Sequence, residues 1–309
     1  MLKVAVGVIK NDAGDILISK RSQKVHQGGL WEFPGGKFEA NETAYQALSR
    51  ELKEELGIGV LSARPLIKIP YHYKDKSVLL DVLEVDSFTG TPVGLEGQPV
   101  KWVSQNALEN HSFPAANKVI IDSIKLSSYY PIVDACLGDE KAMLKQLEKL
   151  MKNGYTQIQL RAKNLALYSF LILAKKAITL SKSKGVRLFV NTSLTTAVSL
   201  KAEGVHLDGH HVKKVNRGVI ESENIDVAFS CHTAADIALA NRLKVTFIVL
   251  SPVCKTQSHI DSKPLGWDNF EKIASEAAMP VYALGGVDPS MLELSYQKGA
   301  QGLSGIRGF

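Results

Sequence analysis

Three glutamates in the first third of the chain have the types and spacing that suit metal chemistry. Glu51, Glu54 and Glu55 lie shortly before a single glycine, Gly57. We expect residues 44–56 to form a helix. At about 100° per residue, Glu51 and Glu55 fall within or beside its apolar stripe, and Glu54 falls just off the edge. Partly buried carboxylates are costly without a cation, and oxygen ligands on so short an arc suit Mg²⁺ or Mn²⁺ with a phosphate completing the shell.

The helix that would position these carboxylates has clear start and stop signals. Thr43 with Gln46 forms a capping-box pattern, and Gly57 suits the left-handed residue that ends a helix. A charge run is most often a solvated face, but a solvated face would place the acids opposite the leucines. Here the acids crowd toward the leucines, which favours a metal site. The far side of the helix would carry Gln46, Arg50 and Lys53, and its apolar stripe would consist of Ala44, Leu48, Leu52 and Leu56.

A longer pattern surrounds this helix. It consists of Gly36, five residues, Glu42, seven residues, and then Arg50-Glu51-Leu52-Lys53-Glu54-Glu55-Leu56-Gly57-Ile58. This pattern resembles the Nudix box. The resemblance is close to the MutT type of Nudix hydrolase and extends over about residues 1–125. It implies an α/β/α sandwich, which we assign to residues 1–128. The implied reaction is hydrolysis of nucleoside triphosphates such as 8-oxo-dGTP to the monophosphate and pyrophosphate, with Mg²⁺ or Mn²⁺.

The same resemblance implies roles for residues outside the helix. The backbone carbonyl of Gly35 would be a further metal ligand, and Glu96 would approach the metal or the attacking water. Either Glu54 or Glu96 could be the general base. Asn117 would read the oxidised purine, although its amide could also cap the helix that follows. The residues that the resemblance places at the nucleotide also include Arg21, His26, Glu32, Phe33, Pro34 and Gly35.

Strand and turn signals predict the rest of the first half. Residues 4–9 and 16–19 flank a turn-rich pentapeptide and are expected to form a hairpin. Residues 31–36 are expected to form one strand that ends in the glycine pair. Further elements are predicted as strands near 63–73, 78–86 and 100–103 and as a helix from about 113 to 126.

Beyond a junction at residues 126–131, short apolar strands alternate with amphipathic helices. Eight such β-then-α units predict a small (β/α)₈ barrel of the TIM type over residues 129–309, with its site at the carboxyl ends of the strands. Helices are expected at 140–152 and 165–184, among others. The expected strands are 132–136, 156–161, 187–191, 204–207, 227–231, 247–253, 281–285 and 302–306.

Polar residues and glycines gather where these strands end. His206 lies in the fourth strand, and Ser230 and His232 follow the fifth. A phosphate cradle is expected from Gly285-Gly286 and Gly305 after the last two strands. Each residue alone is more often structural, but in register with the strand ends they together favour a ligand site. The remaining members are Gln159, Arg161, Lys163, Asn191 and Thr256.

Five segments of this half carry a resemblance to a known family: 159–163, 204–207, 230–232, 251–253 with Thr256, and 283–287. On these segments, this half resembles thiamine-phosphate synthase and its thiazole tautomerase relative. The synthase joins a pyrimidine diphosphate to a thiazole phosphate with Mg²⁺ and releases pyrophosphate. The tautomerase uses a histidine as acid–base without a metal, a role that His232 would fill.

Three departures from the synthase pattern leave the activity of the barrel open. Thr192 stands where the synthase has a metal-binding aspartate, Asp208-Gly209-His210-His211 replaces the region of the second one, and His259 stands where a lysine is expected. The histidines of this region, with His206, could hold zinc, but no cysteine or further histidine completes a set. Synthase, tautomerase and a barrel that only binds a phosphate ligand remain alternatives.

Composition bounds the remaining possibilities. The 309 residues predict two domains, and a net charge of +6 without a long basic block fits anionic small-molecule substrates and no stable nucleic-acid partner. Three well-separated cysteines without a C-x-x-C pattern fit a reducing cytosol. No apolar run is long enough for a membrane span or a signal segment, so we expect a cytoplasmic enzyme, as a monomer or an oligomer. The main alternative keeps Nudix chemistry but directs it at a thiamine-related diphosphate.

Overall fold

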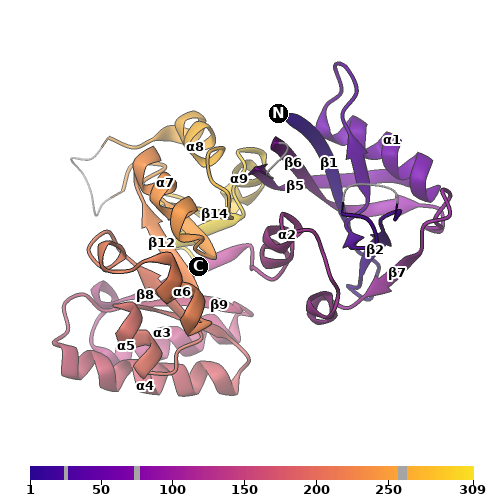
Figure 1. Ribbon diagram of the computed structural model, residues 1–309. Coiled ribbons are helices and arrows are strands. Elements are labelled where there is room, and N and C mark those ends of the chain that lie inside the picture. The colour runs from indigo at the N-terminus through magenta and orange to yellow at the C-terminus, as the bar shows by residue number, and fades with distance from the viewer. Residues whose placement is uncertain (24–26, 73–76, 257–262) are drawn as a thin grey trace. The chain divides into compact units, whose positions relative to one another are not determined.

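The chain folds into two compact units, Met1–Lys125 and Leu126–Phe309 (Figure 1). The structure is a computed structural model of the 309-residue chain. The described residues are 1–23, 27–72, 77–256 and 263–309.

The boundary between the units falls three residues before the predicted one. The sequence predicts the boundary after Ser128, whereas residues 126–128 belong to the second unit. Leu126 packs in the interior of that unit beside Tyr130. The carbonyl oxygen of Ser128 accepts a hydrogen bond of 2.9 Å from the N–H of Leu303. The apparent junction is therefore part of the second fold and closes one end of it.

In its described residues, the first unit contains two β-sheets and two α-helices. A mixed four-stranded sheet has the order β4-β1-β6-β5, in which β1 is parallel to β6 and antiparallel to β4. A three-stranded antiparallel sheet has the order β3-β2-β7. The strands are β1 (Leu2–Ile9), β2 (Ile16–Lys20), β3 (Trp31–Glu32), β4 (Gly35–Lys37), β5 (Gly59–His72), β6 (Ser77–Thr89) and β7 (Val100–Val103). The helices are α1 (Ala44–Leu56), the 3₁₀ helix η1 (Gln105–Asn110) and α2 (Asn117–Ile124).

The four-stranded sheet is the middle layer of the first unit. Successive side chains of a strand point to opposite faces of the sheet. Both faces of β1 and β6 therefore carry apolar side chains. Ala5 and Leu83 pack with Leu48 of α1. On the other face, Val82 packs with Ile120 of α2. This arrangement confirms the predicted α/β/α sandwich.

Two predicted strand arrangements of the first unit are wrong. The described parts of β1 and β2 meet at one bridge, Lys10 with Ile16, and then continue in different sheets, so they are not a hairpin. The predicted strand 31–36 is divided at Phe33-Pro34 into β3 and β4. Proline has no N–H to donate to a ladder, and Phe33 is buried in the core. The segment therefore crosses from one sheet to the other.

The second unit is a closed barrel of eight parallel strands in the order β10-β11-β12-β13-β14-β15-β8-β9, as predicted. Its strands are β8 (Tyr129–Asp134), β9 (Gln157–Arg161), β10 (Arg187–Asn191), β11 (Gly204–Leu207), β12 (Asp226–Cys231), β13 (Phe247–Leu250), β14 (Val281–Leu284) and β15 (Gly302–Gly305). Its α-helices are α3 (Glu140–Lys152), α4 (Leu167–Ser183), α5 (Leu194–Ser199), α6 (Arg217–Glu223), α7 (Ala234–Leu243), α8 (Gly266–Ala274) and α9 (Leu292–Gln297). Short 3₁₀ helices are η2 (Ala135–Leu137), η3 (Val212–Lys214) and η4 (Pro289–Met291).

The first barrel strand begins earlier than the sequence predicts. It starts at Tyr129, not at residue 132, because Tyr130 is fully buried in the barrel interior beside Phe189 and Phe247. The strand ends at Asp134, which places that carboxylate at the carboxyl end of the barrel. An aspartate that the sequence analysis did not single out therefore belongs to the candidate site.

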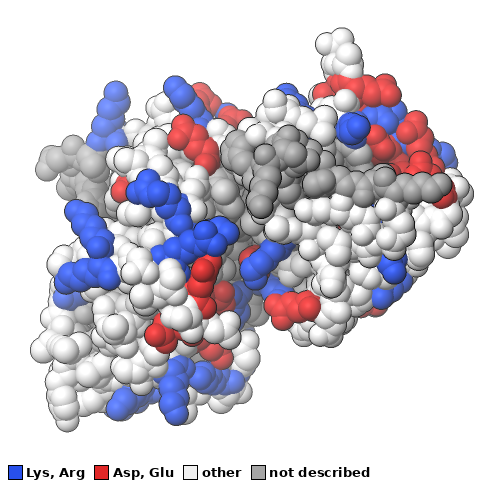
Figure 2. Space-filling view, in the orientation of Figure 1, with Lys and Arg blue, Asp and Glu red and all other residues white. Residues whose placement is uncertain are grey.

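Charged side chains are distributed differently over the two units. Figure 2 shows acidic side chains gathered over the part of the first unit that carries α1, whereas basic side chains are scattered over the visible face of the second unit. Among the described residues, no helix combines the length and the apolar character that a membrane span requires.

Candidate active sites

Helix α1 fixes the direction of the three clustered glutamates, and its ends are those that the sequence predicts. The Thr43 hydroxyl accepts the N–H of Gln46 at 3.3 Å, and the Gln46 side chain accepts the N–H of Thr43 at 2.9 Å. Gly57 ends the helix in the left-handed region with a φ of 71°. The side chains that α1 buries are Ala47, Leu48, Leu52 and Leu56, with Ala44 partly buried.

The glycine pair before α1 makes room for one carboxylate. A Cβ atom built on Gly36 would lie 2.1 Å from the carboxyl carbon of Glu51. Any side chain at position 36 would therefore displace Glu51, whose own side chain is 16% exposed. Glu54 follows three residues later in α1, and its side chain is more exposed, at 59%. The glycine at position 36 therefore leaves the space that the carboxylate of Glu51 occupies.

Glu55 lies among other carboxylates. Burial, followed by the charges of Glu51, Glu32 and Glu96, raises the pKa of Glu55 to about 8. The backbone N–H of Gly35 donates a hydrogen bond to this carboxyl group and opposes the shift. Acids from β3, from α1 and from the loop before β7 therefore converge beside the glycine pair.

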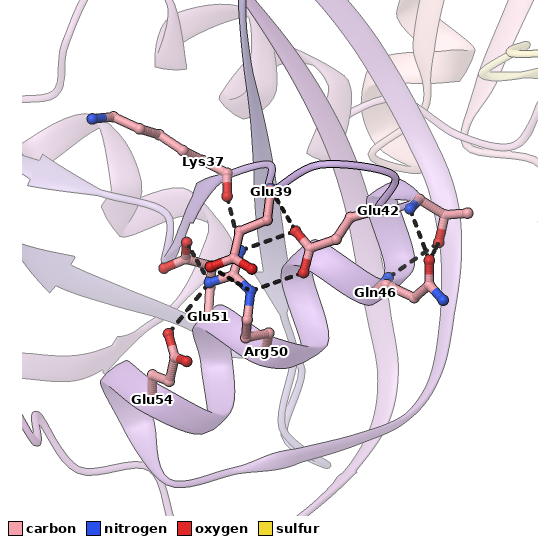
Figure 3. A network of polar contacts seen from close by, with 8 residues as sticks. Lys37, Glu39, Glu42, Gln46, Arg50, Glu51 and Glu54 are labelled. Atoms are coloured by element: carbon pink, nitrogen blue, oxygen red, sulfur yellow. Dashed lines mark hydrogen bonds and ion pairs between the residues drawn. The ribbon is translucent and has the colours of Figure 1, made fainter.

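Arg50 holds the outer carboxylates, a role that sequence reasoning missed (Figure 3). Its guanidinium donates to both oxygens of Glu42, through Nε at 2.8 Å and Nη2 at 3.0 Å. Its Nη1 lies 3.0 Å from Oε1 of Glu51 and 3.3 Å from Oε2 of Glu54. The sequence places Arg50 on the far side of α1 with the exposed Lys53, but its long side chain reaches over the helix. The four-residue spacing to Glu54 was the available signal.

The hydrogen bonds to Arg50 set the ionisation of the outer carboxylates. The guanidinium, together with the N–H of Glu39, lowers the pKa of Glu42 to about 2. The pKa of Arg50 is raised, first by Glu42 and then by Glu51. Nη2 also donates to the carbonyl oxygen of Lys37 at 2.9 Å, which ties the glycine-rich loop to the helix.

The donor chemistry of this cluster fits a hard divalent cation. In the part of the chain that the structure describes, no three acidic, cysteine or histidine side chains converge tightly enough to hold a metal as they stand. Arg50 engages Glu51 and Glu54 instead. The donors present are carboxylate and backbone oxygens, which Mg²⁺ and Mn²⁺ prefer, and the raised pKa of Glu55 shows that this position favours compensation by a cation.

The loop that carries Glu96 is tied to the last turn of α1. The carbonyl oxygen of Glu55 accepts hydrogen bonds from the N–H of Leu95 at 2.9 Å and from Nε2 of Gln98 at 3.0 Å. The side-chain oxygen of Gln98 accepts the N–H of Glu96 at 2.9 Å. Gln98, which the sequence analysis did not select, thus places Glu96 next to Glu55.

The residues predicted to contact the nucleotide occupy different environments. Arg21 forms an ion pair with Glu32, but burial still raises the pKa of Glu32. The Phe33 ring is buried and stacks on Phe113 with centroids 5.5 Å apart. The carbonyl oxygen of Pro34 accepts the N–H of Gly7 at 2.8 Å. His26 lies outside the described residues.

Asn117 does not cap the helix that follows it. The N-cap of α2 is Ala116, and Asn117 is the first helical residue. Its side chain is largely buried, with 9% of the residue exposed, and makes no hydrogen bond to another described residue. The capping alternative is therefore wrong, and the carboxamide is available for a ligand.

The acids at the mouth of the barrel are paired with bases. Arg161 forms an ion pair with Asp134, and Lys163 forms one with Asp208 at 3.1 Å. Burial acts to raise the pKa of both aspartates. Hydrogen bonds from Cys136 and Arg161 lower the pKa of Asp134 overall, and those from His211 and Lys163 lower the pKa of Asp208 well below its usual range.

Close contact explains the glycines after the seventh strand. Gly285 and Gly286 have φ values of 97° and 66°. A Cβ atom would lie 2.9 Å from Pro252 at the first position and 2.4 Å from the carbonyl oxygen of Lys255 at the second. Thr256 borders the same contact, 3.3 Å from a Cβ on Gly285. At Gly305, in the last strand of the barrel, a Cβ would lie 2.4 Å from the ring of Phe309.

The remaining polar residues of the barrel lie on or just beyond the strands that carry them. Gln159 is buried in β9, and Asn191 donates from Nδ2 to the carbonyl oxygen of His206 at 2.8 Å. His232 follows β12, and its Nδ1 lies 2.9 Å from the carbonyl oxygen of Ser251. Because a carbonyl can only accept, Nδ1 carries the hydrogen and Nε2 of the neutral ring keeps its lone pair.

The zinc alternative is wrong for the residues described. Both ring nitrogens of His206 are hydrogen-bonded inside the barrel, to Tyr130 at 3.1 Å and to Ser230 at 2.7 Å. His210 and His211 lie beyond β11, where their backbone N–H groups donate to Asp208. His259, the third departure from the synthase pattern, lies outside the described residues.

Comparison with known proteins separates the two units. A NUDIX domain model matches residues 5–123, and a thiamine monophosphate synthase model matches residues 129–309. The 8-oxo-dGTP diphosphatase of Escherichia coli (strain K12) is 40% identical over 124 residues, 40% of this chain and 96% of the relative. The thiamine-phosphate synthase of Limosilactobacillus fermentum is 33% identical over 174 residues, 54% of this chain and 81% of the relative.

Solved structures agree on the fold of the barrel. A thiamine phosphate pyrophosphorylase from Pyrococcus furiosus is similar with a TM-score of 0.50 and 21% identity, covering 62% of this chain and 88% of that one. At that identity the likeness concerns the fold alone. Together with the family models, the site geometry allows one assignment for each half: the chain belongs to the Nudix family through its first unit and to the thiamine monophosphate synthase family through its second.

Proposed function

We propose that the first unit hydrolyses 8-oxo-dGTP to 8-oxo-dGMP and pyrophosphate. The observation that carries this proposal is the gathering of Glu32, Glu51, Glu55 and Glu96 beside the glycine pair. Such a concentration of carboxylates suits a divalent cation and the polyphosphate that accompanies it. The substrate follows from the relative in Escherichia coli, whose name specifies 8-oxo-dGTP.

Glu51, Glu54, Glu55 and the carbonyl oxygen of Gly35 are the groups that would hold the ion. When bound, Mg²⁺ or Mn²⁺ would neutralise phosphate charge and make water a better nucleophile. Water adds at phosphorus, the bond to the departing pyrophosphate breaks, and a glutamate accepts the proton of the water. Glu54 and Glu96 are the candidates for that base, because they are the more exposed acids of the cluster.

The purine end of the substrate would lie toward α2. The carboxamide of Asn117 offers one donor and one acceptor direction, which matches the edge of an oxidised purine. Arg21, paired with Glu32, and the crossing at Phe33-Pro34 would line the approach to the metal. In this arrangement the segment between β3 and β4 contacts both the nucleotide and the core.

One assay on the full chain tests the substrate. Purified protein with Mg²⁺ is offered 8-oxo-dGTP, dGTP and thiamine diphosphate, and the products are separated by chromatography. Release of 8-oxo-dGMP with pyrophosphate, at a higher kcat/KM than for dGTP, is the expected result. Turnover of thiamine diphosphate alone would instead favour the thiamine-related alternative. The Glu148→Gln variant, altered at an exposed position of α3, serves as the matched control.

We further propose that the barrel binds a thiazole phosphate and moves a proton on it through His232. The observation that favours this second function is the hydrogen bond from Nδ1 of His232 to Ser251, which leaves Nε2 available as a base. Thr192, at the end of the third barrel strand, supplies no carboxylate for a metal. Tautomerisation that persists in EDTA and is lost in His232→Gln is the expected result. Formation of thiamine phosphate from a pyrimidine diphosphate and thiazole phosphate would favour the synthase instead.

A further inference from the structure

A row of three hydrogen-bonded side chains crosses the interior of the barrel. The Tyr130 hydroxyl of β8 lies 3.1 Å from Nδ1 of His206 on β11. Nε2 of the same ring lies 2.7 Å from Oγ of Ser230 on β12. Tyr130 and His206 are buried, at 0% and 2% exposure, whereas Ser230 is only partly buried. The row therefore leads from the closed core toward the carboxyl ends of the strands.

The buried tyrosine decides which nitrogen of His206 carries the hydrogen. Among the described residues, Nδ1 of His206 is the one acceptor within hydrogen-bond distance of the Tyr130 hydroxyl. If Nδ1 carried the hydrogen, the phenol would keep a buried donor without an acceptor, which is unfavourable. Tyr130 therefore donates to Nδ1, and the hydrogen of the neutral ring is on Nε2.

The ionisation of both groups agrees with this assignment. Burial lowers the pKa of His206 to about 3, so the ring is neutral at physiological pH. Burial also raises the pKa of Tyr130 well above its ordinary value, so the phenol keeps its hydrogen. Because the phenol and the neutral ring each have one hydrogen to donate, their hydrogen bonds must run in one direction, from Tyr130 to His206 and from His206 to Ser230.

The direction of the chain determines what Ser230 offers to a ligand. Nε2–H of His206 donates to Oγ of Ser230, which uses the hydroxyl as an acceptor and turns its own hydrogen elsewhere. No second described residue takes that hydrogen. We propose that Tyr130 and His206 are positioning residues that hold Ser230 as a hydrogen-bond donor to a phosphoryl oxygen of the barrel ligand.

The chemistry of the mouth supports a phosphoryl oxygen as the acceptor. The charges of Asp208, Arg161 and Lys163 all act on His206, and that of Asp208 has the largest effect of the three. Each of the two cations is paired with an aspartate. An anionic group that only accepts hydrogen bonds could take the place of such a carboxylate and also accept the hydrogen of Ser230. The choice of a phosphate ligand rests on the proposed function of the barrel. The direction of the hydrogen bonds from Tyr130 through His206 to Ser230 does not depend on that function.

The first test observes the hydrogen directly. Protein labelled with ¹⁵N-histidine gives long-range ¹H–¹⁵N spectra whose pattern distinguishes the two neutral tautomers. The chain has 8 histidines, and His206→Gln identifies the signals of His206 by their loss. The Nε2–H pattern is expected in the wild type, and a mixture of tautomers is expected in Tyr130→Phe. An Nδ1–H pattern at His206 would overturn the proposal.

The second test measures binding of thiamine monophosphate and of inorganic pyrophosphate to the full chain by calorimetry in EDTA. Ser230→Ala is expected to weaken binding about tenfold, the usual effect of losing a hydrogen bond to a charged group. His206→Asn, which cannot reach Ser230, should weaken it similarly. His206→Gln places an amide donor near Nε2 and should restore most of the affinity. Tyr168→Phe, at a position that is 76% exposed, is the control for Tyr130→Phe.

The outcomes separate this inference from the function on which it rests. If the wild-type protein binds neither thiamine monophosphate nor pyrophosphate, the barrel does not bind a phosphate ligand. The phosphoryl oxygen proposed as the acceptor for Ser230 is then rejected as well. Normal binding by Ser230→Ala, or equal losses in His206→Gln and His206→Asn, rejects only the positioning role. A near-ultraviolet circular dichroism spectrum of each variant shows that its core is packed, and Tyr130→Phe keeps the ring contact with Phe247.

Discussion

The two sites treat their carboxylates in opposite ways. In the first unit, Glu55 lies among other acids and its pKa is raised to about 8. In the barrel, Asp134 and Asp208 are paired with Arg161 and Lys163, and their pKa values are lowered. A site that collects acids needs a cation from solution. A site that pairs each acid with a base can instead exchange the acid for an anionic ligand.

Arg50 lies between these two cases. It neutralises the outer carboxylates of α1 through Glu42, Glu51 and Glu54, while Glu55 remains among acids. The first unit therefore has an inner position that favours a metal and an outer position that is already compensated. Binding of an ion by Glu51 and Glu54 requires Arg50 to give up part of its contacts with them.

The largest expected effect is that of Glu54→Gln. We expect diphosphatase turnover to fall by about 10²–10⁴-fold, because the variant loses a metal-binding or proton-accepting carboxylate. The melting temperature should change little, since the Glu54 side chain is 59% exposed. Steady-state kinetics with 8-oxo-dGTP, alongside Glu148→Gln, provide the measurement. Near-normal turnover would remove Glu54 from the reaction.

Arg50→Met should have the next largest effect. Loss of the guanidinium frees Glu51 and Glu54 from their common partner, and residues that orient metal ligands typically change activity by about 10–100-fold. Lys53→Met on the exposed side of the same helix is the matched control. A similar loss of kcat in both variants would show that the charge of α1, and not the contacts of Arg50, is what matters.

Asp208→Asn tests the barrel side of the comparison. The amide can still accept the backbone N–H groups of His210 and His211, but it no longer neutralises Lys163. We expect thiamine monophosphate to bind about two- to fivefold tighter, which is the range for a partly exposed ion pair. Weaker binding, measured by calorimetry, would mean that Asp208 itself contacts the ligand.

The smallest effect concerns the pH dependence of stability in EDTA. A carboxyl group whose folded pKa is raised keeps its proton where the unfolded chain has lost it. The free energy of unfolding therefore falls as pH rises from about 4.5 toward about 8 at Glu55. As pH rises over this range, the melting temperature of Glu55→Gln is expected to fall by a few degrees less than that of the wild type. If the melting temperatures of the two proteins changed equally with pH, the pKa assigned to Glu55 would be contradicted.

The sequence predicts local elements better than the connections between them. The capping box and final glycine of α1 are where the pattern places them, and the bounds of β10 and β11 agree with the prediction. The strand predicted over 31–36 is divided because Phe33 is drawn into the core and Pro34 cannot join a ladder. The role of Arg50 was also missed, because the reach of a long side chain is not part of a helical periodicity.

The sequence by itself determined the helix that carries the acids and the succession of barrel strands, because both depend on the spacing of neighbouring residues. Only the tertiary structure decided that Glu32 and Glu96 join Glu55, and that Tyr130 meets His206 across 76 residues of chain. Such contacts form when a segment passes from one sheet to the other or when the strands of the barrel close. The physical reason is that burial and charge at a site depend on which distant segments share it, and no local period records that choice.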